Sequence, residues 1–269
     1  MKLIVSANSR KHLNSLLEKN IDGVILSIDK LSVNDSFYIN VDDLVDLDFK
    51  DKEVFVSLNK LMHNGDLDYL RTVLSKLRDK CVRIMFYDMA VYNIAKEYDM
   101  VDKLVICQDH LNASVLSNKF YLNRGIKSSY VTSDITKDEL LEIKDKSGME
   151  IFFLGYGYAP IFYSRRYLIS NYLKYIDENN DGKKYEIVSD TGVVYPIDEE
   201  KFGTTIYTEK PINLINYLDE LDKIDYLVLK SNKIDDSEFN KMVDKFINRE
   251  HIDNEYIGFF NKKTIYKVK

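Results

Sequence analysis

The chain has 269 residues, of which 45% are apolar and 30% are charged, and its net charge is −6. This composition is typical of a soluble globular protein. The acidic balance argues against a dedicated, stand-alone nucleic-acid-binding protein, while it leaves room for a local basic patch. No apolar run approaches membrane-spanning length, and the amino-terminal residues lack a signal-peptide core. We therefore expect a cytoplasmic protein without a membrane partner.

Cysteine usage limits the kinds of metal or redox site that the chain can build. Only Cys81 and Cys107 are present, and two thiols cannot supply a four-thiolate metal or iron–sulfur site within one chain. In a cytoplasmic protein, we expect both to be small buried hydrophobes. No histidine or carboxylate cluster has metal-ligand spacing. The sequence therefore predicts no metal and no cofactor.

Strands and helices alternate seven times along the first 154 residues. Short apolar runs predict the strands, and capping residues followed by helical spacing of leucines predict the helices. The expected strands are residues 2–6, 23–27, 53–58, 82–86, 103–107, 128–132 and 151–154. The expected helices begin after Asn8 or Ser9, at 41–47, after Asp66, at 89–97, near 112–122 and after Thr136.

This alternation with short connections predicts parallel βαβ units and an α/β fold. Strands of about five residues suit either a TIM-like (β/α)8 barrel, regular or irregular, or a doubly wound sheet, and the strand count favours the barrel. We expect one domain over residues 1–269.

Residues 149–175 are the stretch in which function is most strongly indicated. The apolar strand at 151–154 is followed by Gly155 and Gly157, which let the backbone turn or approach another element closely. Pro160 excludes an ordinary helix or central strand. A polar cluster with Arg165 and Arg166 comes next, and a helical stripe from Leu168 to Leu173 closes the segment. In α/β proteins, such clusters after a strand are where function is found.

The regular alternation breaks after this segment. Residues 184–189 and 193–197 flank the turn Asp190–Gly192 and predict a hairpin, and 204–207 could add a strand. We expect a small β insertion near residues 184–208, over the barrel mouth. A helix with Leu214, Leu218 and Leu221, an eighth strand at 226–229 and a last helix at 235–246 are expected to follow, and 264–268 reads as extended.

Polar residues that follow the expected strands are the candidates for chemistry. Asn59 and His63 could orient a polar substrate, and His63 could move a proton; the alternative is a histidine on a solvated loop. Arg165 and Arg166 could bind a carboxylate or phosphate in a bidentate manner, or they could be a surface charge pair at a helix start. Cys107 could be a thiol nucleophile only with His110 as partner, and a buried strand-end cysteine is the favoured interpretation.

Several segments also resemble a known family. The stretch 149–175 resembles the signature of the collagenase-like peptidases, peptidase family U32, and in particular the shorter of two paralogues found in many Gram-positive bacteria. Further similarity lies around Asn59 to Asn64, around Gln108, and over residues 204–221. The matching signature residues are Glu150, Gly157, Phe162, Ser164, Arg166, Leu168, Ile169, Asn171 and Tyr172.

The resemblance implies a (β/α)8 barrel, but the chain departs from the family at key positions. Pro160 and Asn213 stand where the family has cysteines, and Ser133-Asp134 replaces an Arg-Glu pair. Many members act in RNA hydroxylation, several of them as iron–sulfur proteins. Because the thiolates are missing here, we assign no catalytic residue. The candidate substrate-binding residues are Asn59, His63, Gln108, Tyr163, Arg165, Arg166 and Asn171.

Three functional hypotheses remain open, and whether the chain is an enzyme is left open with them. The first is a non-catalytic or partner subunit in tRNA wobble-uridine hydroxylation, which meets tRNA through a complex with a family paralogue. The second is a peptidase or other hydrolase acting on peptides, as the family name implies. The third is a barrel that binds a carboxylate ligand without turnover.

Overall fold

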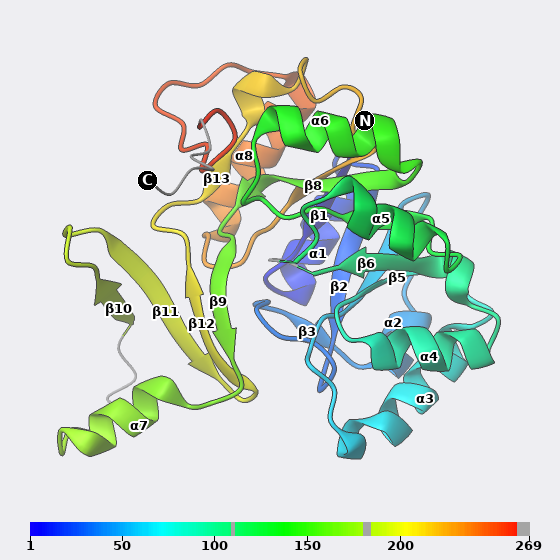
Figure 1. Ribbon diagram of the computed structural model, residues 1–269, viewed down its shortest axis with the longest axis horizontal. Helices are drawn as coiled ribbons and strands as arrows, with labels where there is room; N and C mark the ends of the chain where they lie inside the picture. The colour runs from blue at the N-terminus through cyan, green and yellow to red at the C-terminus, as the bar shows by residue number, and fades with distance from the viewer. Residues whose placement is uncertain (109–110, 180–183, 263–269) are drawn as a thin grey trace.

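A closed barrel forms the body of the molecule (Figure 1). The computed structural model describes residues 1–108, 111–179 and 184–262. Within these ranges, eight parallel strands follow the order β1-β14-β8-β7-β6-β5-β4-β2, and β2 pairs with β1 to close the ring. The TIM-like barrel and its eight expected strands are thus confirmed. The strands are β1 (Lys2–Ser6), β2 (Gly23–Ile28), β4 (Glu53–Leu58), β5 (Val82–Phe86), β6 (Leu104–Cys107), β7 (Ser128–Tyr130), β8 (Glu150–Gly157) and β14 (Tyr226–Leu229), with β3 (Tyr38–Ile39) beside β2.

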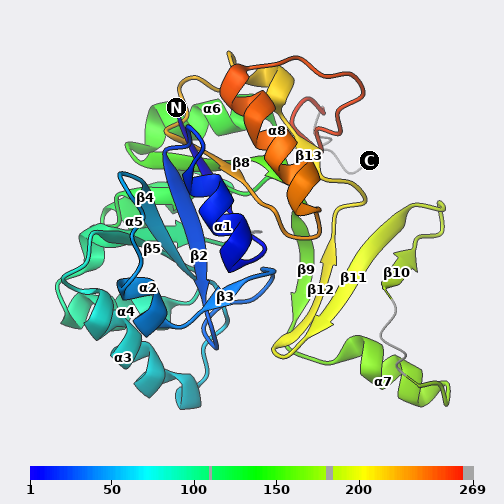
Figure 2. The same cartoon turned by 180° about the vertical axis from the view of Figure 1, so that it is seen from behind.

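Helices pack around the outside of the barrel (Figures 1 and 2). Ser9, Ser114 and Thr136 cap three of them, since each side chain accepts a hydrogen bond from a backbone N–H in the first turn. The expected cap at Asp66 is not formed; its carboxylate accepts from the His63 N–H instead. The helices are α1 (Arg10–Leu17), α2 (Val41–Val45), α3 (Leu67–Leu77), α4 (Met89–Glu97), α5 (Val115–Leu122), α6 (Lys137–Ser147) and α8 (Asp236–Asn248), with the short 3-10 turns η1 (Asn64–Asp66), η2 (Val101–Lys103) and η3 (Ile215–Tyr217).

Two glycines of β8 allow the close approach that the sequence predicts. A Cβ at Gly155 would lie 2.5 Å from the side chain of Leu227 on β14. Gly157 has φ +127°, and a Cβ there would lie 2.5 Å from the Lys230 carbonyl oxygen. Only glycine adopts this backbone without strain. The strand therefore runs three residues beyond Leu154 before the chain leaves the barrel.

Aromatic rings and one arginine close the amino end of the barrel, where the strands begin. The Arg83 guanidinium lies within 5.5 Å of the ring centres of Phe55, Phe152 and Tyr226, and the last two rings stack 4.2 Å apart. Arg83 also forms an ion pair with Glu150 at 2.8 Å. This packing fills the barrel interior, as in other barrels of this class.

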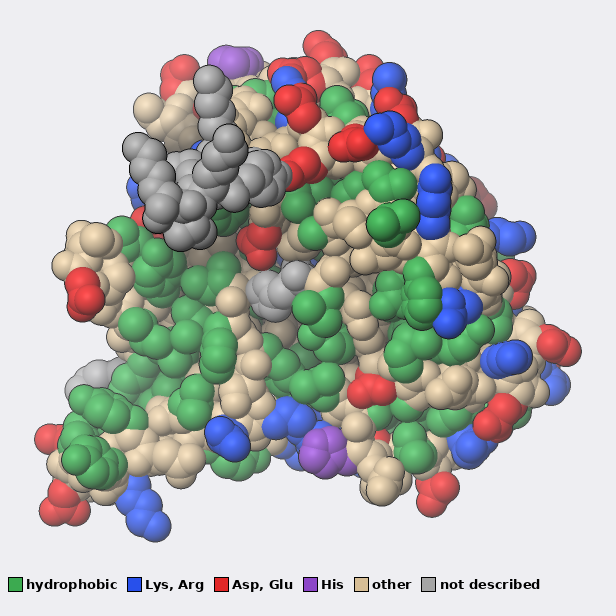
Figure 3. Space-filling view, viewed as in Figure 1, with side chains coloured by type: hydrophobic (Ala, Val, Ile, Leu, Met, Phe, Trp, Pro, Cys, Tyr) green, Lys and Arg blue, Asp and Glu red, His purple; other side chains and the backbone are tan. Residues whose placement is uncertain are grey.

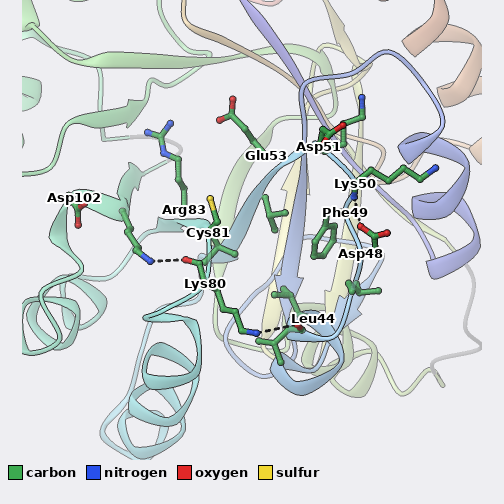
Figure 4. Close-up of a pocket in the computed structure, with 16 residues that line it drawn as sticks. Leu44, Asp48, Phe49, Lys50, Asp51, Glu53, Lys80, Cys81, Arg83 and Asp102 are labelled. Atoms are coloured by element: carbon green, nitrogen blue, oxygen red, sulfur yellow. Dashed lines mark hydrogen bonds between the residues drawn. The ribbon is translucent and has the colours of Figure 1, made fainter.

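A shallow hollow lies outside this packed end, and charged residues of both signs surround it (Figure 4). Its cations already have partners: Lys80 donates to the Val45 carbonyl, and Lys103 donates to the Lys80 carbonyl at 2.7 Å. Cys81 lies on this rim and is exposed, so the expectation that it is buried was wrong. The reason is its place in the turn between α3 and β5, before the buried part of the strand begins.

A second, antiparallel sheet stands beside the barrel, and we call residues 160–207 the arm (Figure 1). In the described chain it has the strand order β10-β11-β12-β9, and α7 (Leu168–Tyr175) packs on β11 and β12. The expected hairpin around Asp190–Gly192 and the strand at 204–207 are confirmed. The sequence did not predict the strand at 160–164, which makes the insertion larger than expected. The strands are β9 (Pro160–Ser164), β10 (Tyr185–Val188), β11 (Val194–Glu200) and β12 (Gly203–Tyr207).

The segment between the arm and β14 is irregular, where a helix was expected. Leu214, Leu218 and Leu221 are buried as expected, but only the 3-10 turn η3 forms, after the two-residue strand β13 (Ile212–Asn213). Backbone bonds fix this path, because the Leu214 N–H donates to the Gly155 carbonyl at 2.8 Å. The expected extended tail at 264–268 lies outside the described residues. Among the described residues, no helix is long and apolar enough to cross a membrane.

Candidate functional site

The carboxyl ends of the barrel strands form the mouth, and the arm stands beside it. A small hollow at the mouth is lined from β7, β8, β14 and the loops that follow them. The Lys230 ammonium lies 5.7 Å from the ring centre of Tyr130 in this wall. The lining residues are Tyr130, Ser133, Leu154, Tyr158, Ala159, Pro160 and Lys230. The mouth therefore combines aromatic rings with a positive charge.

The space-filling view shows how side chains are distributed on this face (Figure 3). Hydrophobic side chains gather over the arm and over the neighbouring part of the barrel. Lys, Arg and His side chains gather at the lower margin of the same face. A ligand with an apolar body and an anionic group would be complementary to this arrangement.

Arg165 connects the arm to the barrel. It follows β9, and its guanidinium donates to the Leu61 carbonyl on the loop after β4 at 3.1 Å. Burial opposes ionisation of both Asp66 and Tyr163, and the positive charge of Arg165 acts against that effect at both groups, although the pKa of Tyr163 remains raised. Arg165 therefore helps to hold the arm against the barrel.

Lys60 is a buried charge beside this connection, and the sequence did not single it out. Its side chain is 1% exposed, and its ammonium pairs with Asp66 at 2.8 Å and lies 4.4 Å from the Phe202 ring centre. Burial opposes ionisation of Asp66, but hydrogen bonds from Lys60 and from the His63 backbone outweigh it and lower the pKa of that carboxyl. The sequence signal for this pair was a lysine two residues after the end of β4.

Tyr163 is positioned from the arm side of the same cluster. Its hydroxyl donates to the Phe202 carbonyl at 2.8 Å. Burial raises the pKa of Tyr163 to about 12, so the phenol stays protonated at neutral pH. The Tyr163 hydroxyl is therefore a fixed hydrogen-bond donor, and its ring forms an apolar wall of the cluster.

The amides of Asn59 and Gln108 are used inside the protein. Asn59 donates to the Val33 carbonyl at 2.9 Å and accepts from the Val33 N–H at 2.8 Å. Gln108 donates to the Tyr87 carbonyl at 3.2 Å and accepts from the Tyr121 hydroxyl at 3.1 Å. Both residues therefore shape the loops around the mouth, whether or not they also meet a substrate.

The remaining candidates lie at the surface. His63 is exposed at the start of η1, Asn171 is exposed on α7, and Arg166 is exposed at the end of the arm. In the described part of the chain, the Arg166 guanidinium has no hydrogen bond or ion pair. The structure thus brings Tyr163 and Arg165 together at the mouth, while Asn171 lies on the separate helix α7.

A partly buried polar seam joins the other side of the arm to the barrel, and the sequence did not predict it. Tyr38 donates to Glu200 at 2.9 Å, and Asn232 donates to the Tyr207 hydroxyl at 3.2 Å. Lys233 pairs with Asp198. Burial and the nearby carboxylates raise the pKa of Glu200, although the Tyr38 hydroxyl opposes this shift. The seam fixes where the arm stands relative to the mouth.

The chain's thiols do not fit an iron–sulfur cluster. Cys81 precedes β5 and Cys107 ends β6, and these neighbouring strands are parallel, so the two thiols lie at opposite ends of the barrel. Cys107 is buried, as the favoured interpretation of the sequence expected, and its suggested partner His110 lies outside the described residues. The described residues contain no group of three or more His, Cys, Asp or Glu side chains placed to hold a metal ion.

Two comparisons with known proteins found similarity. The tRNA hydroxylation protein P2 of Bacillus subtilis is 26% identical to the chain, over 63% of this chain and 57% of that protein. The match thus spans little more than half of the relative's length. The sequence profile of peptidase family U32 matches residues 9–254, which include every strand of the barrel except β1 and the whole of the arm. The chain belongs to peptidase family U32.

Proposed function

We propose that this protein is a non-catalytic partner subunit in tRNA wobble-uridine hydroxylation. The observation that carries the proposal is the similarity to a relative that is named for tRNA hydroxylation. The small number of thiols and their positions at opposite ends of the barrel support a non-catalytic role. In this proposal, a cysteine-bearing member of the same family supplies the chemistry.

The mouth and the arm would then contribute recognition. The exposed Arg166 guanidinium is free to bind a phosphate or carboxylate in a bidentate manner. The backbone of Arg166 is held on the arm, because its N–H donates to the Ser164 hydroxyl and its carbonyl accepts from the Thr204 hydroxyl. Because the net charge is −6, tRNA binding would depend on the complex rather than on this chain alone.

Mass spectrometry of tRNA nucleosides from a strain without this gene tests the proposal. We expect wobble nucleosides derived from 5-hydroxyuridine to fall in the deletion strain and to return when the wild-type gene is restored. Affinity purification of the tagged protein should recover a cysteine-rich family member. Unchanged nucleosides in the deletion strain would contradict the proposal. A carboxylate-binding barrel would then be the better description, to be tested by ligand-induced thermal shifts.

A further inference from the structure

The arm sheet has an open edge at β10. Strand β10 is the last strand of the arm sheet, since it pairs with β11 and with no other strand of the described chain. At the other end of the sheet, β9 lies next to the barrel, whereas β10 lies farthest from it in both views (Figures 1 and 2). A strand of another chain could therefore reach β10 without meeting the barrel.

The register with β11 shows which backbone groups of β10 point outward. Glu186 lies opposite Pro196, which has no N–H to donate, so this is a non-hydrogen-bonded pair. In an antiparallel ladder the two kinds of pair alternate, so Val188 opposite Val194 is also non-hydrogen-bonded. The N–H and C=O groups of Glu186 and Val188 are therefore directed to the open edge.

Two of the four side chains of β10 are aliphatic and exposed. Ile187 is 39% exposed and Val188 is 63% exposed. Open edges of natural sheets are commonly protected by lysines, prolines or bulges, because an unprotected edge pairs with other strands. Strand β10 carries none of these over its four residues. The edge is thus suited to pairing with another strand.

The charges around β10 are complementary to those of a second copy. When two β10 strands run antiparallel about Ile187, Glu186 of each copy lies opposite Val188 of the other, and these are the residues with outward backbone groups. In the same register, Lys184, directly before β10, comes near Asp190 in the turn after β10 of the other copy, once on each side of the two-fold axis. Opposite charges across strands stabilise a pairing.

Neighbouring registers lack this complementarity. A pairing centred on Glu186 places two glutamates opposite each other, and one centred on Val188 places Glu186 opposite Asp190. Both put like charges across the interface, which destabilises it. If one β10 strand shifted by a single residue, its outward-directed backbone groups would face residues of the other strand whose N–H and C=O groups point toward β11. No hydrogen-bonded ladder would then form.

We propose that β10 is a self-association edge, at which two copies of this chain pair antiparallel about Ile187 and join their arm sheets. A two-fold edge of this kind is self-complementary and closes after two copies. It uses no residue of the mouth, so it leaves both mouths open. It is independent of the function proposed above.

Sedimentation of the purified full chain between about 5 and 100 µM tests the association, because a two-fold interface is concentration-dependent. We expect a dimer for the wild type and a monomer for Val188→Pro, which removes the outward N–H while the ladder with β11 is kept. Val188→Thr, which keeps the N–H, is the matched control and should remain dimeric. Circular dichroism verifies that each variant is folded. A wild-type monomer over the whole range would overturn the proposal.

Two further variants test the register. Lys184→Asp should raise the dissociation constant by roughly tenfold, and adding Asp190→Lys should restore it. In a Cys81→Ser background, Ile187→Cys should form a disulfide-linked dimer under oxidising conditions, because opposed non-hydrogen-bonded residues are close. Glu186→Cys should cross-link much less. Equal cross-linking at both positions would refute a pairing about Ile187.

Discussion

At the amino end of the barrel, the guanidinium of Arg83 lies against three aromatic rings and pairs with Glu150. On the arm beside the carboxyl end, Arg166 is exposed, and its guanidinium has no hydrogen bond or ion pair in the described part of the chain. The two residues are chemically identical, but their surroundings give them different roles. A partnered, half-buried arginine stabilises the fold, whereas an exposed one is available to a ligand.

Removing Arg83 should have the largest effect on stability. Arg83→Ala should lower the free energy of unfolding by about 3 kcal/mol, since it removes the contacts with three rings and leaves Glu150 and the Tyr226 hydroxyl without this donor. Urea unfolding followed by circular dichroism measures the loss. The control is Arg78→Ala, an exposed arginine at the same end, which should change stability by less than about 0.5 kcal/mol. Equal effects of the two variants would show that the closed end is not stabilising.

At the mouth, we expect the backbone conformation of Gly157 to contribute more to stability than the side chains do. Gly157→Ala should cost about 2 kcal/mol, because its φ of +127° and the 2.5 Å approach to the Lys230 carbonyl leave no room for a Cβ. Gly65→Ala is the matched control, since nothing lies within 4 Å of a Cβ built there. The two variants are compared by thermal unfolding. If Gly157→Ala were as stable as Gly65→Ala, this part of the mouth would not be fixed as described.

The seam should give a smaller effect that depends on pH. The pKa of Glu200 is raised in the folded state, so its contribution to stability is present at low pH and is lost as pH rises above its usual pKa. Glu200→Gln cannot ionise and still accepts from Tyr38. Its stability relative to the wild type should therefore increase between pH 4.5 and 7.5, by less than about 1 kcal/mol. Melting temperatures at several pH values measure this, and a difference that stays constant with pH would contradict it.

A contrast between local patterns and distant contacts explains what could be predicted from the sequence. Strands such as Gly23–Ile28 are buried at every residue, so an apolar run was enough to find them. The arm strand Pro160–Ser164 and the seam at Glu200 depend on partners more than 30 residues away. Lys60 is similar, because its burial follows from Phe202 on the distant arm. Local patterns carry no information about such contacts, which is why the barrel was predicted and the surroundings of the mouth were not.

The proposed role requires that an exposed arginine beside the mouth acts in tRNA modification and that one at the amino end of the barrel does not. A comparison of two arginine variants tests this requirement. In the deletion strain, the gene is restored with either Arg166→Ala or Arg78→Ala, and wobble nucleosides are measured by mass spectrometry. Both changes remove one exposed arginine and should leave stability nearly unchanged. We expect 5-hydroxyuridine-derived nucleosides to fall with Arg166→Ala and to be fully restored with Arg78→Ala. Full restoration by both variants would contradict the role assigned to the mouth.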